Sequence, residues 1–258
     1  MKEKEQTLEE RMLGYRSSTD YRLEKSLPVL IMVDGRSFSR QVKNRFKLPF
    51  DQEFINIMNK TAEYVSKNIQ GCKFAYTQSD EISFYVDCSK REEETPFFEY
   101  RLSKILSIVS SMTTSMFNYL MSNEFPEPLY QFDCKAWNVP TQNDVFAWFL
   151  YRQIDCIRNS KQQAAQTYIS HKDLMGKNTD LQIKLLLERE GIDWNLYNPG
   201  EKYGRFIWKE EEKYYNEKLG VEYLRSVWKA HNGWELTSLE GKEKLWNQLF
   251  KEENKKES

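Results

Sequence analysis

Two acidic positions carry the residue types that metal-assisted chemistry needs. Asp34 ends a short apolar run and is followed directly by Gly35, and Asp80 and Glu81 lie between two further short runs. Histidine is scarce, since the chain has only His171 and His231, and none of its four cysteines forms a Cys-x-x-Cys pair. Catalysis by a histidine base and a zinc site are therefore not favoured by the sequence. We expect catalysis by carboxylates that bind hard divalent cations.

The chemistry that such carboxylates support depends on their coming together. Two carboxylates held close repel each other unless a proton or a cation lies between them, and Mg²⁺ with its oxygen ligands is the natural partner. Two such ions about 4 Å apart stabilise both the attacking and the leaving oxygen of a phosphoryl displacement. Gly35 leaves room for a triphosphate and offers its carbonyl as a further ligand. The competing interpretation is that Asp34-Gly35 and Ser79-Asp80 are simply turns.

Basic side chains form a second candidate set. Five of them and one acid lie between Asp34 and Lys47, namely Arg36, Arg40, Lys43, Arg45 and Lys47. Arg101 and Lys104 stand one helical turn apart, and such groups can grip a triphosphate. Arg152, Arg158 and Lys161 form a further basic stripe near Tyr151, which suits an RNA-facing surface. A solvated surface is the competing interpretation for each of these groups.

Hydrophobic periodicity predicts the elements that position these residues. Short apolar or alternating runs predict strands over Leu27–Val33, Phe74–Thr77, Ile82–Val86 and Tyr130–Val139. Apolar residues at three- and four-residue steps predict helices over Leu8–Lys25, Asp51–Ile69, Pro96–Met121, Asn143–His171 and Thr179–Glu190. The stretch Asp193–Ile207 is predicted as a loop with a short strand, and the remainder as helical.

The order strand, helix, strand, strand, helix, strand is that of the ferredoxin-like βαββαβ arrangement, an α+β fold. We expect the helices to cover one face of an antiparallel sheet and the first strand to lie beside the strand that enters the hairpin. Asp34 and Asp80 would then meet at one edge. Residues 1–140 are predicted as the catalytic domain, and residues 141–258 as a mainly helical extension packed on it.

Composition narrows the class of protein. The 38 basic and 39 acidic residues give a net charge of -1, which excludes a globally basic nucleic-acid binder but not a local basic strip. The longest apolar runs are too short to span a bilayer, and the N-terminus does not read as a signal peptide. We expect a cytoplasmic protein with reduced thiols and no membrane partner.

Two sequence blocks resemble a known family. Val33-Asp34-Gly35-Arg36-Ser37-Phe38 and Phe74–Phe84, which contains Gln78-Ser79-Asp80-Glu81, resemble the signature of tRNA-His guanylyltransferases and their relatives, the 3′–5′ polymerases. Weaker blocks follow at Arg101–Lys104, Phe132-Asp133, Arg152–Cys156 and Gly191–Asn195. The resemblance runs from about Tyr15 to Ile207.

The resemblance implies a polymerase-like palm with two Mg²⁺ ions and ATP, GTP or another nucleoside triphosphate as substrate. It assigns Asp34, Gly35 and Asp80 to the metals, and Asp34, Asp80 and Glu81 to catalysis. The implied nucleotide ligands are Asp34, Gly35, Arg36, Ser37, Phe38, Ser39, Ser79, Asp80, Arg101 and Lys104, and the expected RNA contacts are Lys47, Arg152, Arg158 and Lys161. Family members activate a 5′-monophosphorylated tRNA with ATP, and the 3′-hydroxyl of the incoming nucleotide then attacks the activated 5′ phosphate. The resemblance also implies a homo-oligomer, a tetramer.

Two departures from the family pattern point to one of its branches. Eukaryotic guanylyltransferases have His-Ile-Asn-Asn after the Asp-Cys pair, where this chain has Ile157-Arg158-Asn159-Ser160. A family lysine is replaced by Leu48, beside Lys47. These changes favour the guanylyltransferase-like branch, which repairs 5′-truncated tRNAs by template pairing. The alternatives are a tRNA-His-specific enzyme that adds G at position -1, a nucleotide cyclase on the same palm, and a non-catalytic RNA-binding protein.

Overall fold

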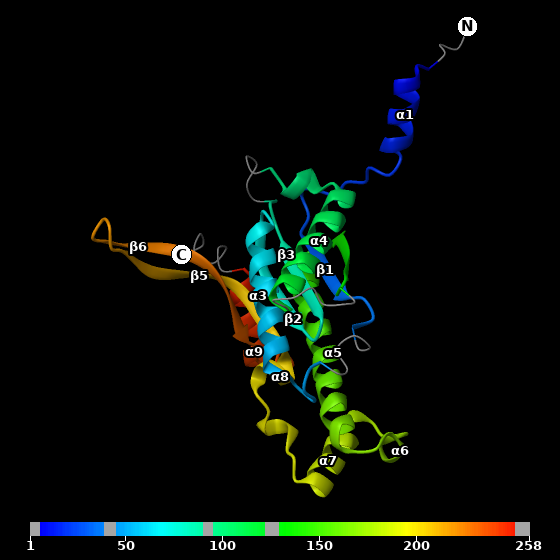
Figure 1. Cartoon of the computed structure of the whole chain (residues 1–258), viewed down its shortest axis with the longest axis vertical. Coiled ribbons are helices and arrows are strands. Elements are labelled where there is room, and N and C mark those ends of the chain that lie inside the picture. Colours follow the sequence, from blue (N-terminus) through cyan, green and yellow to red (C-terminus); the bar gives the residue numbers. More distant parts are fainter. Residues whose placement is uncertain (1–5, 39–44, 90–94, 122–128, 251–258) are drawn as a thin grey trace.

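A six-stranded antiparallel sheet forms the centre of the molecule (Figure 1). The computed structural model describes residues 6–38, 45–89, 95–121 and 129–250. The strand order is β4-β1-β3-β2-β5-β6, and the first four strands have the ferredoxin-like order. The strands are β1 (Val29–Gly35), β2 (Cys72–Gln78), β3 (Glu81–Val86), β4 (Phe132–Asn138), β5 (Arg205–Asn216) and β6 (Val221–Asn232). The predicted α+β fold with its antiparallel sheet is confirmed.

Alternate residues of the strands enter two different cores, one on each face of the sheet. Val29, Ile31 and Val33 of β1 belong to one buried cluster, whereas Leu30 belongs to the other. The first face is covered by α3 (Gln52–Asn68) and α4 (Leu102–Met121). Asp51 caps α3 by accepting from the N–H groups of Glu53 and Phe54, which fixes where that helix begins.

The opposite face is also covered by helices, which differs from the predicted one-sided arrangement. The helices α5 (Gln142–Tyr168) and α9 (Leu239–Leu249) pack there, with Val145 and Phe149 of α5 and Leu245 of α9 fully buried. The central strands β1, β2 and β3 are buried on both faces, and a second helical layer is what buries Leu30 and Phe74. Because α5 lies across this face, its polar residues reach the ends of β1 and β3.

Smaller elements complete the chain. Leu8–Ser17 forms α1, which ends earlier than predicted and has no buried residue. It stands away from the rest of the ribbon (Figure 1). The others are η1 (Phe97–Tyr100), α6 (His171–Leu174), α7 (Thr179–Glu190), η2 (Trp194–Leu196) and α8 (Pro199–Tyr203). No helix in the described ranges is long and apolar enough to cross a membrane.

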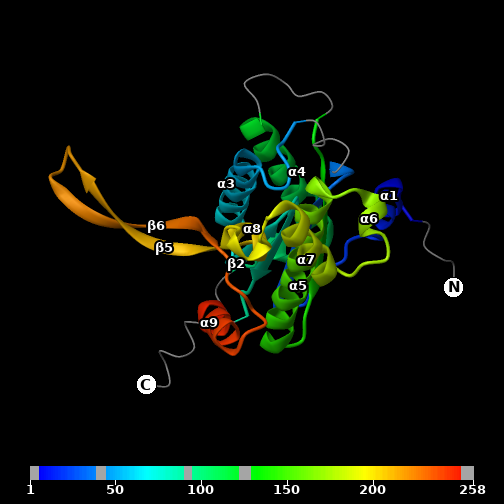
Figure 2. The ribbon, with the colours of Figure 1, turned by 90° about the horizontal axis from the view of Figure 1, so that it is seen from below.

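The prediction of helices after Ile207 is wrong for residues 208–232, which with residues 205–207 form β5, β6 and the turn between them. These residues form a long hairpin whose inner end pairs with β2 at Ala75, Tyr76 and Thr77. Its outer half extends beyond the body of the molecule (Figure 2). Lys and Glu are common in this stretch and favour a helix locally, and the strand alternation is weak where both faces are wet. Cross-strand pairs, such as Tyr214 opposite Tyr223, stabilise it instead.

Candidate functional site

Acidic residues gather at the edge of the sheet where β1 ends and β3 begins. Asp34 lies opposite Glu81 in the β1–β3 pairing, and opposite Asp133 in the β1–β4 pairing. Asp80 lies in the two-residue turn that joins β2 to β3. The first strand was predicted to neighbour the strand that enters this turn, and this is wrong, because β1 pairs with β3, which leaves it. The turn is so short that Asp80 still reaches Asp34.

Gly35 and two serines shape the backbone around these carboxylates. A Cβ at Gly35 would lie 2.2 Å from the ring of Phe38 and 2.7 Å from Oδ2 of Asp80, so any side chain there would displace the carboxylate. Ser37 and Ser79 have φ angles of 54° and 47°, a conformation that non-glycine residues adopt mainly where the surroundings impose it. The Ser79 hydroxyl donates to Oδ1 of Asp80 over 2.9 Å and orients it.

The carboxylates are held at an electrostatic cost. Burial, together with the neighbouring charge of Asp34, raises the pKa of Asp80 to about 6. Burial and the charge of Asp133 raise the pKa of Asp34 above its usual value, while Lys135 and Arg152 oppose that rise. Two partly desolvated carboxylates that repel each other are a site that a cation would stabilise.

The donor set fits Mg²⁺. No group of three or more His, Cys, Asp or Glu side chains that could hold a metal is found among the described residues. Mg²⁺ is, however, usually held by one or two carboxylates and completes its shell with water and substrate phosphates. Asp34 and Asp80, beside the bare backbone of Gly35, match that requirement.

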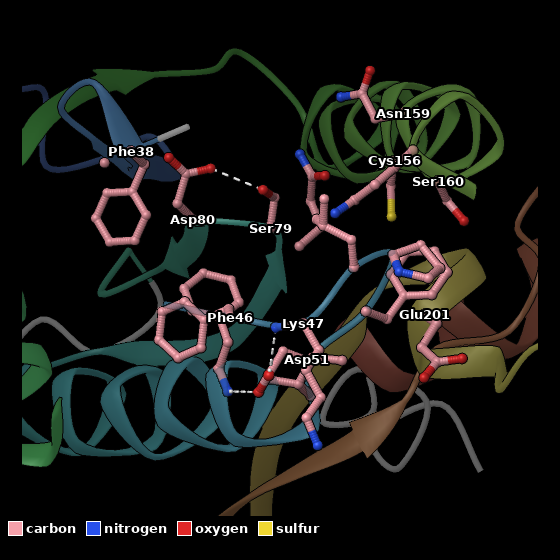
Figure 3. Close-up of a pocket in the computed structure, with 18 of the residues that line it drawn as sticks. Phe38, Phe46, Lys47, Asp51, Ser79, Asp80, Cys156, Asn159, Ser160 and Glu201 are labelled. Carbon is pink, nitrogen blue, oxygen red and sulfur yellow. Dashed lines mark hydrogen bonds between the residues drawn. The ribbon is translucent and has the colours of Figure 1, made fainter. Parts of the chain in front are cut away.

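A cavity of about 670 Å³ opens beside the carboxylates (Figure 3). Asp80 and Ser79 lie at one end, and Cys156, Ser160 and Glu201 lie at the other. The segment before α3 contributes Phe46, Lys47 and Asp51 to the wall. This volume lies within the range of small-molecule and cofactor sites.

Several predicted nucleotide ligands line this cavity, and others do not. Asp34, Gly35, Ser37, Ser79 and Asp80 line it. Phe38 also lines it, although its ring is buried among Phe54, Phe117, Tyr130 and Phe132. Arg36 is not among the lining residues, and its Nη1 donates to Oε1 of Gln131 over 2.8 Å. Ser39, together with Arg40 and Lys43, lies outside the described residues.

Arg101 and Lys104 lie apart from the carboxylates. They line a separate hollow of about 630 Å³ against α1, which shares no lining residue with the carboxylate cavity. Nε of Arg101 lies 3.0 Å from Oδ1 of Asp20. The expected contact with triphosphate therefore stays a prediction, because the structure does not bring these two residues to Asp34 and Asp80.

Glu81 and Arg152 form one buried pair that links β3 to α5. Nε of Arg152 donates to Oε1 of Glu81 over 2.7 Å, and Nη2 bonds the other carboxylate oxygen. Burial raises the pKa of Glu81 even though Arg152 opposes that rise. The structure thus gives Glu81 a partner of opposite charge, and the guanidinium of Arg152 is already engaged. The catalytic role of Glu81 and the RNA contact of Arg152 stay predictions.

The other expected RNA contacts occupy different surroundings. Lys47 lines the carboxylate cavity, whereas Arg158 pairs with Asp155 and keeps 60% of its side chain exposed. Nζ of Lys161 lies 2.7 Å from Oδ1 of Asp180 on α7. These placements separate Lys47 from the α5 stripe with which it was grouped.

Some lining residues have no counterpart among the predicted ligands. Four come from one face of α5 and two from the segment before and at the start of β5, namely Cys156, Asn159, Ser160, Gln163, Glu201 and Arg205. In the sequence, the α5 residues of this group are spaced three or four apart. This spacing was enough to predict that they share one polar face of the helix. Arg205 carried none, since its guanidinium is positioned by Asn59 and by the carbonyl of Gly200.

Comparisons with known proteins identify the family of this chain. The family model described as tRNAHis guanylyltransferase matches residues 9–140. The tRNA(His) guanylyltransferase of Schizosaccharomyces pombe is 33% identical over 231 residues, which cover 80% of this chain and 87% of that protein. tRNA(His) guanylyltransferase 2 of Arabidopsis thaliana is 26% identical over 234 residues, which cover 79% of this chain but only 43% of the plant protein.

Solved structures show the same fold. A bacterial tRNA(His) guanylyltransferase-like protein in complex with ATP superposes with a TM-score of 0.82 at 29% identity, covering 95% of this chain and 99% of the other. The complex of such a protein with GTP gives a TM-score of 0.75 at 28% identity, covering 95% of this chain and all of the other. The match of the family model over about half of the chain and the relationship to the S. pombe enzyme lead to one conclusion: the chain belongs to the tRNAHis guanylyltransferase family of nucleotidyltransferases.

Proposed function

We propose that this protein is a Mg²⁺-dependent nucleotidyltransferase that adds nucleotides in the 3′–5′ direction to the 5′ end of tRNA, restoring 5′-truncated molecules by template pairing. The observation that carries the proposal is the Asp34–Asp80 pair at the mouth of a nucleotide-sized cavity. ATP and GTP, the ligands named for the bacterial neighbours, are the proposed substrates.

The chain's own residues bind and orient the reactants. Asp34 and Asp80 are the proposed ligands of two Mg²⁺ ions, which when bound neutralise phosphate charge and stabilise the attacking and leaving oxygens. Ser79 holds Asp80 in place through its hydroxyl. Lys47 lies in the cavity wall, where its ammonium suits a phosphate. The 5′ phosphate is first adenylylated with release of pyrophosphate, and the 3′-hydroxyl of the incoming nucleotide then displaces AMP.

The sequence of α5 supports template pairing, because it lacks the His-Ile that the guanylyltransferase pattern has after the Asp-Cys pair. Recognition of a single-stranded loop, such as one anticodon, usually needs side chains that stack on splayed bases and hydrogen bond to their edges. Ile157 and Arg158 replace the His-Ile of the guanylyltransferase pattern, and Arg158 is paired with Asp155. Template pairing needs no such side chains, because the opposing base of the acceptor stem selects the nucleotide. G-1 addition specific to tRNA-His is the alternative outcome.

The two outcomes are separated by a nucleotide-addition assay. Several 5′-truncated tRNAs with 5′ monophosphates are incubated with ATP and one labelled nucleoside triphosphate at a time. We expect the added nucleotide to be the complement of the opposing base, and to change when that base is changed. Addition of G alone, only to tRNA-His and regardless of the opposing base, would establish the guanylyltransferase instead. Asp80→Ala serves as the inactive control.

A homo-oligomer, expected as a tetramer, is part of the proposal. The outer half of the β5–β6 hairpin exposes large apolar side chains: Tyr215, Leu219, Val221, Tyr223 and Leu224. An exposed apolar patch of this kind commonly marks a protein interface.

A further inference from the structure

A second hollow lies on the other side of the same carboxylates. It has a volume of about 460 Å³ and shares five lining residues with the nucleotide cavity, namely Asp34, Gln78, Ser79, Asp80 and Asn159. The remainder of its wall differs, because it is formed by Met32, three aromatic residues, Lys135, and Arg152 with its acidic partners Glu81 and Asp155. Two reactants that meet at Asp34 and Asp80 therefore have one adjoining hollow each.

Three aromatic side chains form one wall of this second hollow. The rings of Trp137 and Trp148 lie 4.8 Å apart at 75°, and those of Trp148 and Tyr151 lie 5.8 Å apart at 49°. Trp137 comes from β4, and the other two come from successive turns of α5. We call this set, Trp137, Trp148 and Tyr151, the aromatic wall.

The aromatic wall is fixed in place and yet open. Nε1 of Trp148 donates to Oγ of Ser83 on β3 over 3.1 Å, which locks the indole against the sheet. The guanidinium of Arg152 lies 5.2 Å from the ring centre of Tyr151, and Glu81 holds that guanidinium. Tyr151 nevertheless remains 59% exposed. Its ring is therefore accessible to a ligand in the hollow beside the carboxylates.

We propose that the aromatic wall stacks the terminal base of the tRNA acceptor stem, so that its 5′ phosphate lies at Asp34 and Asp80. The inference rests on the proposed function, in which the cavity of about 670 Å³ takes the triphosphate and the second reactant needs its own place. Aromatic side chains bind bases of any sequence by stacking, which suits an enzyme that accepts different tRNA ends. Lys135, exposed on β4 in the same hollow, offers a positive charge to the phosphate.

The test measures binding without catalysis. The probe is an acceptor-stem RNA duplex with a 5′ monophosphate and the fluorescent base 2-aminopurine at its 5′ terminal position, titrated with Mg²⁺ present and no triphosphate, so that no transfer occurs. A second probe carries 2-aminopurine three pairs inside the duplex. We expect the protein to quench the terminal probe and leave the internal one unchanged, because only the terminal base reaches the aromatic wall.

Tyr151→Ala should weaken binding of the terminal probe roughly 5- to 150-fold, the scale of one base stacked on an aromatic side chain, and should abolish the quench. Tyr151→Phe keeps the ring and should bind normally. Ile154→Ala is the matched control, because Ile154 is 51% exposed on the same helix and lines neither hollow. Thermal melting of each variant checks that the fold is retained.

The possible outcomes are distinct. Equal affinity and equal quenching for Tyr151→Ala and the parent protein would overturn the proposal. So would a loss confined to binding of free ATP or GTP, since the hollow would then belong to a mononucleotide. Failure of the proposed function would appear elsewhere, as absence of nucleotide addition by a parent protein that still quenches the terminal probe.

Discussion

Asp34 and Asp80 show at the scale of single residues that a reactive site can cost stability. Each is a partly buried carboxylate with a raised pKa, and the charge of Asp34 contributes to the shift at Asp80. A carboxyl group whose pKa is higher in the folded state than in the unfolded state binds its proton more tightly when folded. Its contribution to stability is therefore present below the unfolded pKa and is lost as the pH rises through the folded value.

Asp80→Asn should make the protein more stable and inactive. The pKa rises from 3.8 to about 6, so the metal-free parent should lose up to about 3 kcal/mol of unfolding free energy between about pH 4 and pH 6 that the variant keeps. Urea unfolding in EDTA at several pH values measures this difference, and nucleotide addition measures the loss of activity.

Glu63→Gln is the matched control for that experiment. Glu63 is another half-buried carboxylate whose pKa is raised by burial, but it accepts from the N–H of Ala230 and lines none of the hollows described above. This variant should keep nucleotide addition. An Asp80→Asn protein that is no more stable than the parent above pH 6, or that still transfers nucleotides, would contradict the assigned site.

At the scale of elements, the site depends on how α5 is attached to the sheet. The pair of Arg152 with Glu81 joins the two where both side chains are largely removed from water. Removal of one partner of a buried pair leaves an uncompensated charge, which usually costs 3–5 kcal/mol, whereas an exposed pair contributes about 0–1 kcal/mol. The two ion pairs on α5 should therefore differ greatly in their effect on stability.

Arg152→Met should lower the unfolding free energy by about 3–5 kcal/mol, because Glu81 is then buried without a partner of opposite charge. Arg158→Ala, at an exposed pair on the same helix, should change it by less than about 1 kcal/mol. The double variant Arg152→Met with Glu81→Gln should recover part of the loss. Equal losses for Arg152→Met and Arg158→Ala would show that the buried pair does not anchor α5.

At the scale of the whole molecule, the outer half of the β5–β6 hairpin contributes no buried side chain to the core of its own chain. Residues 221–226 of β6 are all exposed, whereas Ile207 and Trp228 nearer the sheet are buried. Apolar side chains such as Leu219 and Leu224 are therefore available to another copy of the chain.

If the proposed homo-oligomer assembles through this hairpin, replacement of residues 213–224 by an Asn-Gly turn should give smaller species and leave the melting temperature of the body nearly unchanged. Light scattering coupled to size-exclusion chromatography measures the mass. Glu217→Ala and Lys218→Ala, at the polar turn of the intact hairpin, are the controls. A truncated protein with the same number of subunits as the parent would show that the hairpin does not carry the interface.

The sequence by itself determined the local part of this protein. The run Val29–Val33 followed by Asp34-Gly35, and the alternation of Ile82, Phe84 and Val86, were enough to place two carboxylates at strand ends, because strand periodicity and turn residues are local signals. The spacing of apolar residues in α3 was also enough to predict that helix, and its end at Asn68 was predicted within one residue.

Only the tertiary structure decided which distant residues meet. The β5–β6 hairpin was missed because its pairing with β2 joins residues about 130 apart, and its own Glu- and Lys-rich residues carry no preference that reveals this. From the sequence, Arg152 was interpreted as a cation available to RNA. Its partner Glu81 lies 71 residues away in the chain, and no local pattern indicates the pair. The helix α5 brings Asn159 into the wall of the cavity that Asp80 also lines, for the same reason. Burial of the apolar face of α5 on the sheet, and not any local property of those residues, fixes where its polar face lies.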